Sequence, residues 1–410
     1  MFFFYKFLSL IIYPFLNIFL RIRILTKKED KIRFKEKLGH PSLATKPNLI
    51  WFHVASLGEI KSIHSIIKYY QKNKELNILI TSVTTSSSNY FDENLKSHNT
   101  FHQYAPIDNP IIIERFLNFW NPKLSIFVES EIWPNMIFQT SKKCKLILLN
   151  ARISKNSFKK WKFFKNIFKK IMNKFEFILP QSNEVLKILE FFDLKKIKFI
   201  GNIKYTNIDK NFSNKLEISN NKNSWAAMSI HYGEVDYIIQ AHKNISANHP
   251  DLLTFLIPRH LNKIVDIVNK IEKENLPYLK ISNDNRINNF HGIVIIDKYG
   301  LADEIFNNVR IVFMGGSFID HGGQNPIEPL KYDCKILTGK NIYNFTEIYN
   351  ELINKKIAKI VNDQSSLEKE LISYIKDYDK DTLDQDNLDY KEFSNKIFKN
   401  TIEFLDNYIL

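Results

Sequence analysis

Short apolar runs alternate with longer amphipathic stretches along most of the chain from residue 48 onward. In the first half, the apolar runs at residues 49–53, 78–82, 124–128, 145–149 and 177–180 predict strands. Apolar residues at helical spacing predict helices at residues 59–71, 111–119 and 184–192. This alternation is typical of an α/β fold in which the strands form a parallel sheet.

The alternation stops between residues 206 and 224, where Asn and Lys dominate and no periodicity is evident. We expect a linker at residues 208–224. Beyond it, apolar runs at residues 254–257, 292–296, 310–314 and 335–338 predict a second sheet. The sequence therefore predicts two Rossmann-like domains, residues 29–207 and 225–387, followed by a terminal helix at 388–410. Ligands are expected in a cleft between the domains, beyond the carboxyl ends of the strands.

The N-terminus is apolar over residues 1–20, with a charge only at Lys6, and four basic residues follow before residue 29. About 20 apolar residues are enough to cross a bilayer, and the basic flank is typical of the cytoplasmic side. We expect residues 1–28 to form a membrane-anchor helix that either spans the membrane or lies in its surface. The alternative is an apolar helix packed on the protein.

A second segment, residues 157–178, places aromatic and aliphatic residues at helical spacing among seven lysines. Basic amphipathic helices with aromatic faces bind anionic membrane surfaces. The alternative is a core helix whose solvent-facing side is rich in lysine.

Composition limits the classes of function. With 410 residues the chain is long enough for two domains. The two cysteines, Cys144 and Cys334, show neither a disulfide pattern nor zinc-ligand spacing. A net charge of +14 attracts nucleic acid, anionic lipid or phosphorylated substrates. Glycine is scarce, with 11 residues, of which five lie between Gly315 and Gly339, so this stretch is expected to have demanding backbone geometry.

Two carboxylate motifs follow predicted strands of the first half. Glu59 ends the segment His53-Val-Ala-Ser-Leu-Gly-Glu and enters a predicted helix. It is either a base that deprotonates a hydroxyl nucleophile or an ordinary first-turn glutamate that stabilises the helix. Glu129 and Glu131 follow the strand at 124–128, and because two nearby carboxylates resist ionising together, we expect one to pair with a base such as Arg152.

Lys204, in the segment Gly201-Asn-Ile-Lys, is a candidate for neutralising phosphate charge. The alternative is a surface lysine.

The second half contains candidates for phosphate binding. Arg259 follows a predicted strand and offers a planar fork of donors. The pairs Gly315-Gly316 and Gly322-Gly323 would leave backbone N–H groups free for phosphate, next to a helix start, and Glu328 would hydrogen-bond ribose hydroxyls. The alternative for each pair is a tight turn. No dinucleotide-binding glycine motif follows the first strand and no P-loop motif occurs, which argues against NAD binding and P-loop ATP hydrolysis.

Taken together, these motifs resemble those of the Kdo (3-deoxy-D-manno-octulosonic acid) transferases of lipid A assembly, in the same order and over essentially the whole chain. The resemblance is carried by the apolar N-terminus and by residues 53–59, 129–135, 150–154, 201–204, 258–260, 315–328 and 344–345. It implies a GT-B fold of two Rossmann-like domains with the donor in the cleft between them.

The resemblance also implies an inverting glycosyltransferase that moves Kdo from CMP-Kdo to lipid IVA without a metal or cofactor. Glu59 matches the family's general base, and Glu129 and Lys204 match residues that support the transition state. The CMP contacts map to Pro258, Arg259, Tyr299, Gly300, Leu301, Asn325, Pro326, Ile327 and Glu328. The implied location is the cytoplasmic face of the inner membrane, on an anionic lipid surface, with no nucleic-acid partner.

The chain departs from the family pattern in three places. Tyr299-Gly300-Leu301 stands where Met-Gly-Glu is usual, and residues 230–234 lack one acidic residue of a T-H-E-G-E-like segment. Gln324 replaces the histidine that usually precedes the N-P-L-E motif. Two alternative functions remain open, which are a GT-B enzyme that uses a UDP-sugar and a non-catalytic scaffold that binds membranes.

Overall fold

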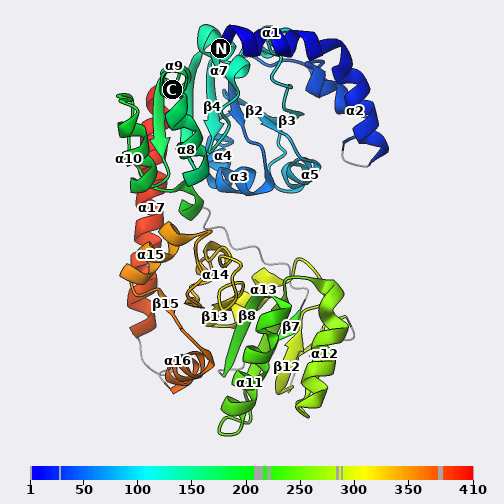
Figure 1. Cartoon of the computed structure of the whole chain (residues 1–410), viewed down its shortest axis with the longest axis vertical. Coiled ribbons are helices and arrows are strands. Elements are labelled where there is room, and N and C mark those ends of the chain that lie inside the picture. Colours follow the sequence, from blue (N-terminus) through cyan, green and yellow to red (C-terminus); the bar gives the residue numbers. More distant parts are fainter. Residues whose placement is uncertain are drawn as a thin grey trace. The chain divides into compact units, whose positions relative to one another are not determined.

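The computed structural model describes residues 2–26, 29–206, 216–218, 223–282, 286–287, 290–376 and 382–409. The chain divides into two compact units, one formed by residues 1–207 with 393–410 and the other by residues 208–392. Each unit is built around its own parallel sheet (Figure 1).

The sheet of the first unit has six parallel strands in the order β3-β2-β1-β4-β5-β6, the doubly wound arrangement of dinucleotide-binding folds. The strands are β1 (Leu49–His53), β2 (Asn77–Ser82), β3 (Thr100–Tyr104), β4 (Leu124–Val128), β5 (Lys145–Ala151) and β6 (Phe177–Pro180). The apolar runs predict all of these except β3. That strand escapes the pattern because His102 and Gln103 are buried in it as hydrogen-bonded polar residues.

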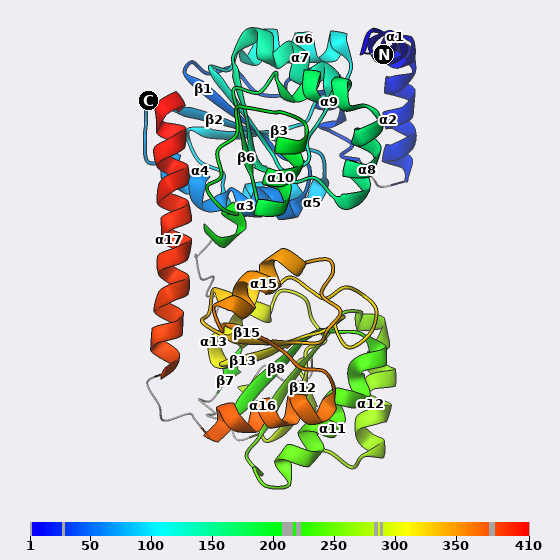
Figure 2. The same ribbon diagram turned by 60° about the vertical axis from the view of Figure 1, so that its left-hand side comes forward.

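Helices cover both faces of this sheet (Figures 1 and 2). One face carries α6 (Pro110–Trp120), α7 (Pro134–Lys143), α9 (Lys165–Met172) and α10 (Asn183–Phe191), which bury one apolar core against the strands. The other face carries α3 (Leu57–Ser62), α4 (His64–Tyr70), α5 (Thr85–Asn94) and the end of α17 (Thr382–Ile409), with a second core. The loops that connect each strand to the following helix run along the carboxyl edge of the sheet.

Two of the predicted helices are interrupted. The helix predicted at residues 59–71 is α3 followed by α4, because Ile63 leaves helical geometry at φ −96° and ψ 2°. The lysine-rich segment forms α8 (Lys155–Phe163) and α9, separated at Phe164, and the helix ends at Met172 rather than 178. Phe168 is fully buried, whereas Phe163 is 86% exposed. Most of the apolar face of α9 therefore packs on the core, which favours the core-helix alternative for this half of the segment. Helix α8 has no buried residue, so the alternative of a membrane-binding face stays open there.

The apolar N-terminus forms α1 (Phe2–Ile12) and α2 (Leu16–Leu25). Residues Phe4–Leu25 are long and apolar enough to cross a membrane by length and composition, with a mean hydropathy of 1.7. One side of α1 is attached to the first unit, where the Tyr5 hydroxyl donates to Asp108 at 2.7 Å and the Asn109 side chain donates to the Ser9 carbonyl at 2.6 Å. Most of the remaining apolar side chains of α1 and α2 are exposed.

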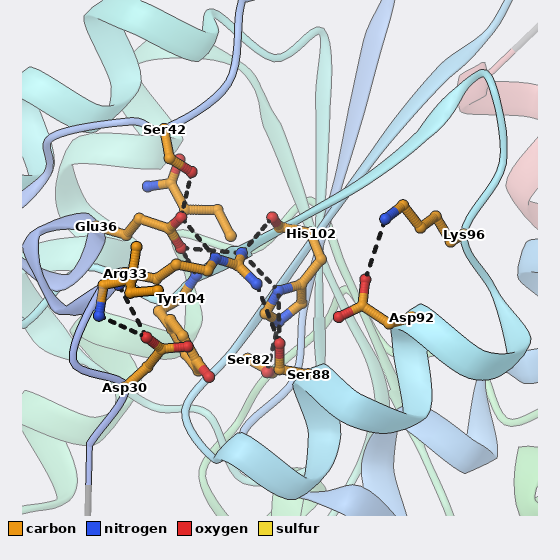
Figure 3. Close-up of polar contacts among 12 residues, drawn as sticks. Asp30, Arg33, Glu36, Ser42, Ser82, Ser88, Asp92, Lys96, His102 and Tyr104 are labelled. Atoms are coloured by element: carbon orange, nitrogen blue, oxygen red, sulfur yellow. Dashed lines mark hydrogen bonds and ion pairs between the residues drawn. The ribbon is translucent and has the colours of Figure 1, made fainter.

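The segment that follows the apolar N-terminus is fixed to the first sheet by a polar network around Arg33 (Figure 3). The Arg33 guanidinium binds both carboxylate oxygens of Glu36, at 2.9 and 3.1 Å, and donates to the His102 carbonyl at 2.7 Å. Glu36 also accepts the backbone N–H of Tyr104. Burial, and then the charge of Arg33, lower the pKa of His102 to about 3, so this imidazole is neutral. The network is therefore structural and leaves Arg33 no role at a ligand site.

The second unit has a seven-stranded parallel sheet in the order β10-β12-β9-β8-β13-β14-β15. Its strands are β8 (Ser224–Ile230), β9 (Leu253–Pro258), β10 (Tyr278–Lys280), β12 (Gly292–Ile295), β13 (Ile311–Met314), β14 (Lys335–Thr338) and β15 (Ala358–Ile360). The helices are α11 (Val235–Ser246), α12 (Ile264–Lys273), α13 (Ala302–Asn308), α14 (Ile327–Leu330), α15 (Thr346–Asn354) and α16 (Gln364–Lys376). The apolar runs predict β9, β12, β13 and β14. They miss β8, which has Ala226 and Ala227 at its centre, and the three-residue strands β10 and β15.

Most of the linker predicted at 208–224 lies outside the described residues. Within it, β7 (Glu217–Ile218) pairs in parallel with β11 (Arg286–Ile287), and β8 begins at Ser224. These parts of the segment are therefore strand rather than irregular linker.

Candidate active site

Glu59 lies at the start of α3, directly beyond the carboxyl end of β1. Ser56 is the N-cap of this helix and accepts the backbone N–H of Glu59. In return, the Glu59 carboxylate accepts the backbone N–H of Ala55 at 2.7 Å and the Ser56 hydroxyl at 3.1 Å. The pattern differs from a capping box, because the carboxylate accepts the N–H of the residue before the N-cap and not that of the N-cap itself. These reciprocal hydrogen bonds nevertheless show that Glu59 stabilises the helix start.

The same carboxylate is electrostatically unusual. Glu59 is only 9% exposed, and burial is the main cause that raises its pKa to about 7. The nearby charges of Glu131 and Glu129 act in the same direction, and the hydrogen bonds from Ala55 and Ser56 oppose them. A carboxylate that changes protonation near neutral pH is suited to general-base catalysis. The helix-capping role and a catalytic role are therefore compatible.

Glu129 sits beyond the carboxyl end of β4, in left-handed backbone geometry with φ 59°. Its side chain is 4% exposed and forms an ion pair with Lys204 at 2.7 Å, while Arg152 stands 3.9 Å away. The expectation that a motif glutamate pairs with Arg152 is confirmed, and Lys204 is the nearer cation. Lys204 is thus not a simple surface lysine.

Lys204 is held in place by two asparagines. The Asn202 side chain accepts the backbone N–H of Lys204 at 3.0 Å, and the Asn150 side chain accepts that of Ile203 at 3.1 Å. Gly201 has φ 119°, and a Cβ there would lie 2.9 Å from Ile397 of α17. The glycine therefore allows the C-terminal helix to pack against the loop that carries Lys204.

Glu131 has different partners from Glu129. Its carboxylate lies 3.1 Å from His53 Nε2 and accepts the indole N–H of Trp133 at 2.6 Å. Burial pushes the pKa of Glu131 upward, but the contacts with His53 and Trp133 outweigh it and lower the pKa. The other ring nitrogen of His53 contacts Thr81 at 2.9 Å. The contact between His53 and Glu131 was not predicted from the sequence. The feature that could have indicated it is a histidine at the end of an apolar strand.

In the second unit the first glycine pair is organised differently from the expectation. The Glu234 carboxylate, fully buried, accepts the backbone N–H groups of Gly316 at 2.7 Å, Ser317 at 3.0 Å and Phe318 at 3.0 Å. The prediction that the N–H groups beside this pair are free for phosphate is therefore wrong, because a side chain of the same unit already occupies them. Gly315 is needed for close packing, since a Cβ there would lie 2.6 Å from the Ser229 carbonyl oxygen.

The second glycine pair forms a tight turn. Gly322 and Gly323 have φ values of 79° and 74°, and the backbone N–H of Asn344 donates to the Gly322 carbonyl at 3.0 Å. Helix α14, which follows, is a single turn, and the Asn325 side chain accepts its first N–H, that of Ile327. The helix start therefore offers less to an anion than the sequence suggests.

The remaining candidates lie in loops at the carboxyl edge of the second sheet. Pro258 ends β9, and the exposed Arg259 donates its backbone N–H to the Ile230 carbonyl at the end of β8. The loop that follows β12 holds Tyr299, which is 79% exposed, Gly300, which has φ 83°, and the buried Leu301. Asn325, Pro326, Ile327 and the half-buried Glu328 stand after β13. Adjacent strands β12, β9, β8 and β13 thus carry these residues to one edge.

Comparisons with known proteins agree on one family. Residues 32–207 match the family described as 3-Deoxy-D-manno-octulosonic-acid transferase (kdotransferase). The chain is 31% identical to a 3-deoxy-D-manno-octulosonic acid transferase of Rickettsia bellii, covering 99% of this chain and 97% of the relative. It is 30% identical to the enzyme of that name from Haemophilus influenzae, covering 88% and 87%.

Solved structures agree on the fold. A glycosyltransferase from Rickettsia africae matches with a TM-score of 0.55 at 14% identity, covering 88% of this chain and 98% of that one. A UDP-N-acetylglucosamine 2-epimerase matches with a TM-score of 0.58 at 10% identity, covering 88% and 97%. The predicted GT-B fold class with two Rossmann-like domains is confirmed. Because the sequence similarity to named transferases extends over nearly the whole chain, the protein belongs to the 3-deoxy-D-manno-octulosonic acid transferase family of glycosyltransferases.

Proposed function

We propose that this protein transfers Kdo from CMP-Kdo to lipid IVA by direct displacement with inversion at the anomeric carbon, without a metal ion. Family membership supports the reaction class. The observation that carries the catalytic assignment is Glu59, a buried carboxylate beyond the end of β1 whose pKa is raised to about 7. In this proposal, residues 29–207 bind the acceptor and residues 225–387 bind the CMP-sugar.

Glu59 acts as the general base. Its ionised form takes the proton from the acceptor hydroxyl while that oxygen bonds to the anomeric carbon and the bond to the CMP phosphate breaks. Positioned general bases contribute roughly 10²–10⁴-fold to rate. The Glu129–Lys204 ion pair, at 2.7 Å, supplies a fixed charge beside this base and supports the transition state electrostatically.

The donor binds the second unit. Arg259 holds phosphate through its planar fork of donors. Glu328 and the backbone around Tyr299, Gly300 and Leu301 contact the cytidine, with Pro258, Asn325, Pro326 and Ile327 shaping the site. The support for this assignment is that all of these residues gather at one edge of the second sheet.

In this proposal the apolar N-terminus anchors the enzyme at the cytoplasmic face of the inner membrane. Its support is the length and apolarity of Phe4–Leu25 together with the exposure of most of its side chains. The net charge of +14 adds attraction to anionic lipid.

The direct test incubates the purified protein with CMP-Kdo and lipid IVA and weighs the lipid product by mass spectrometry. We expect product mass to rise by one or more Kdo units. In parallel, CMP should protect the protein against thermal unfolding and UDP should not. Protection by UDP alone would favour a UDP-sugar transferase, and vesicle binding without any nucleotide protection would favour a scaffold.

The catalytic assignment is tested with Glu59→Gln. Its matched control is Glu184→Gln, which alters an exposed first-turn glutamate of α10 in the same unit. We expect the first variant to lose transfer activity and the control to keep it. A Glu59→Gln enzyme with the activity of the wild type would overturn the assignment.

A further inference from the structure

Three histidines gather at the carboxyl edge of the second sheet. His231 follows β8, His260 follows β9 and His321 lies in the loop after β13. The rings of His231 and His321 are stacked, with centroids 4.3 Å apart and planes inclined by 18°. His260 meets His231 edge-on at 5.7 Å. Three separate loops thus bring imidazoles together next to Arg259.

Two side-chain nitrogens lie close to the backbone of Gly316. His231 Nε2 is buried and has no hydrogen-bond partner among the residues that the structure describes. It lies 3.5 Å from the position that a Cβ of residue 316 would take, and Gln324 Nε2 lies 3.3 Å from the same position. Gly316 has φ 67°, so a side chain there is disfavoured by backbone geometry as well as by space. The glycine keeps two nitrogens of facing loops close to a common point.

The electrostatics of this cluster favour an anionic ligand. Burial lowers the pKa of His231, and the charges of His321, His260 and Arg259 act in the same direction. Glu234 opposes them, but its carboxylate already accepts four backbone N–H groups, those of His231, Gly316, Ser317 and Phe318. An anion placed against the cluster would favour the protonated imidazole, because opposite charges stabilise the charged form. Binding of such a ligand is then coupled to proton uptake.

We propose that His231, His260 and His321 form a subsite that takes up a proton when it binds the phosphate group of the donor nucleotide. The inference rests on the proposed CMP-sugar binding by this unit and adds a role that none of the three histidines has in that proposal. A protonated imidazole N–H donating to a phosphate oxygen makes a charge-assisted hydrogen bond.

Isothermal titration of the full-length protein with CMP tests the proton uptake. At pH 7.5 the phosphate of CMP is above its second pKa of about 6, so the ligand contributes little to the proton balance. Titrations in two buffers with different ionisation enthalpies give the number of protons exchanged. We expect net uptake with CMP and none with cytidine, which lacks the phosphate. Affinity for CMP should rise as pH falls from 8.5 to 6.5, by at most about tenfold per pH unit for one coupled proton.

Variants locate the protonated group. His321→Asn changes an exposed ring and should not disturb folding; we expect it to reduce proton uptake and to weaken CMP binding at pH 6.5 by about tenfold, with little change at pH 8.5. His231→Asn should remove the uptake. The control is His291→Asn, an exposed histidine before β12 at the opposite end of the sheet, which should behave as the wild type.

The two proposals fail in different ways. CMP binding without proton uptake, or equal CMP affinity and pH dependence in wild type and His321→Asn, would refute the histidine subsite and leave the transferase assignment intact. Failure of CMP to bind at all, with UDP binding in its place, would refute the donor assignment itself.

Discussion

The buried Glu59 should lower the free energy of unfolding near neutral pH, and the variant Glu59→Gln allows this effect to be measured. The pKa of Glu59 is raised to about 7 from an ordinary 4.5, mainly by burial. A difference of that size corresponds to roughly 3 kcal/mol between the two protonation states, at 1.36 kcal/mol per pKa unit. Since the folded-state pKa is the higher one, the folded protein is favoured while Glu59 is protonated, and this advantage is lost between about pH 4.5 and pH 7.

Glutamine cannot ionise, so the variant escapes this loss. We expect the unfolding midpoint of Glu59→Gln relative to wild type to rise by several degrees between pH 5 and pH 8, at ~2–4 °C per kcal/mol for a unit of about this size. The pH-independent effect of replacing a carboxylate that accepts two hydrogen bonds cancels in this comparison. Differential scanning calorimetry at both pH values measures it, with Glu184→Gln as the control whose offset stays constant. A pH-independent offset for Glu59→Gln would refute the raised pKa.

In the proposed mechanism the same ionisation governs catalysis. The wild-type kcat/KM should fall below pH 7 by about tenfold per pH unit, because only the ionised Glu59 accepts a proton. A rate that stays level down to pH 5.5 would show that the reaction uses a different base.

Four further outcomes are expected. Lys204→Met should lower kcat about 10²-fold and destabilise the first unit, because Glu129 loses its nearer cation. The double variant with Glu129→Gln should regain the melting temperature of the wild type but not its activity. Kinetics and calorimetry measure these two quantities. Glu234→Gln should cost about 2 kcal/mol of unfolding free energy and weaken CMP binding, because this one carboxylate accepts four backbone N–H groups. Urea unfolding and titration measure the two effects. Tyr5→Phe removes the bond to Asp108 and should make α1 more sensitive to limited proteolysis while vesicle binding persists. Dialysis against EDTA should leave transfer activity unchanged in the product assay.

The fold was largely predictable because parallel strands covered on both faces are continuous apolar runs. The pattern fails where burial is achieved by other means. In β3, hydrogen bonds to Ser82 and Trp120 accompany the burial of His102 and Gln103. In β8, the run of large apolar residues is interrupted by Ala226 and Ala227. Helix breaks at Ile63 and Phe164 also escape the sequence, since both residues are apolar and fit the helical spacing. Tertiary packing decides these positions.

The sequence motifs predicted which residues belong to the candidate site, but not which hydrogen bonds and ion pairs these residues form. Motif residues Glu59, Glu129 and Lys204 follow β1, β4 and β6, and strand order brings Glu129 and Lys204 into an ion pair. The tasks of His53 and Glu234 could not be predicted, because each acts through partners distant in sequence. In both cases a buried polar side chain fixes a loop, which composition and spacing do not reveal.

The glycine positions show where the backbone geometry is demanding, but the reason for that geometry differs from the one that the sequence suggests. The cluster between Gly315 and Gly339 does mark demanding backbone geometry, as a glycine-poor chain suggests. A Cβ at Gly315 or Gly339 would lie 2.6 or 2.4 Å from a backbone oxygen, so these residues permit two loops to pack tightly. Glu234 then takes up the N–H groups beside the first pair. With those amides occupied and α14 only one turn long, an anionic donor group at this edge must be held mainly by side chains. In the donor site proposed above, Arg259 and the three histidines His231, His260 and His321 would supply this electrostatic contribution. The sequence alone assigned it to the backbone of the glycine motif.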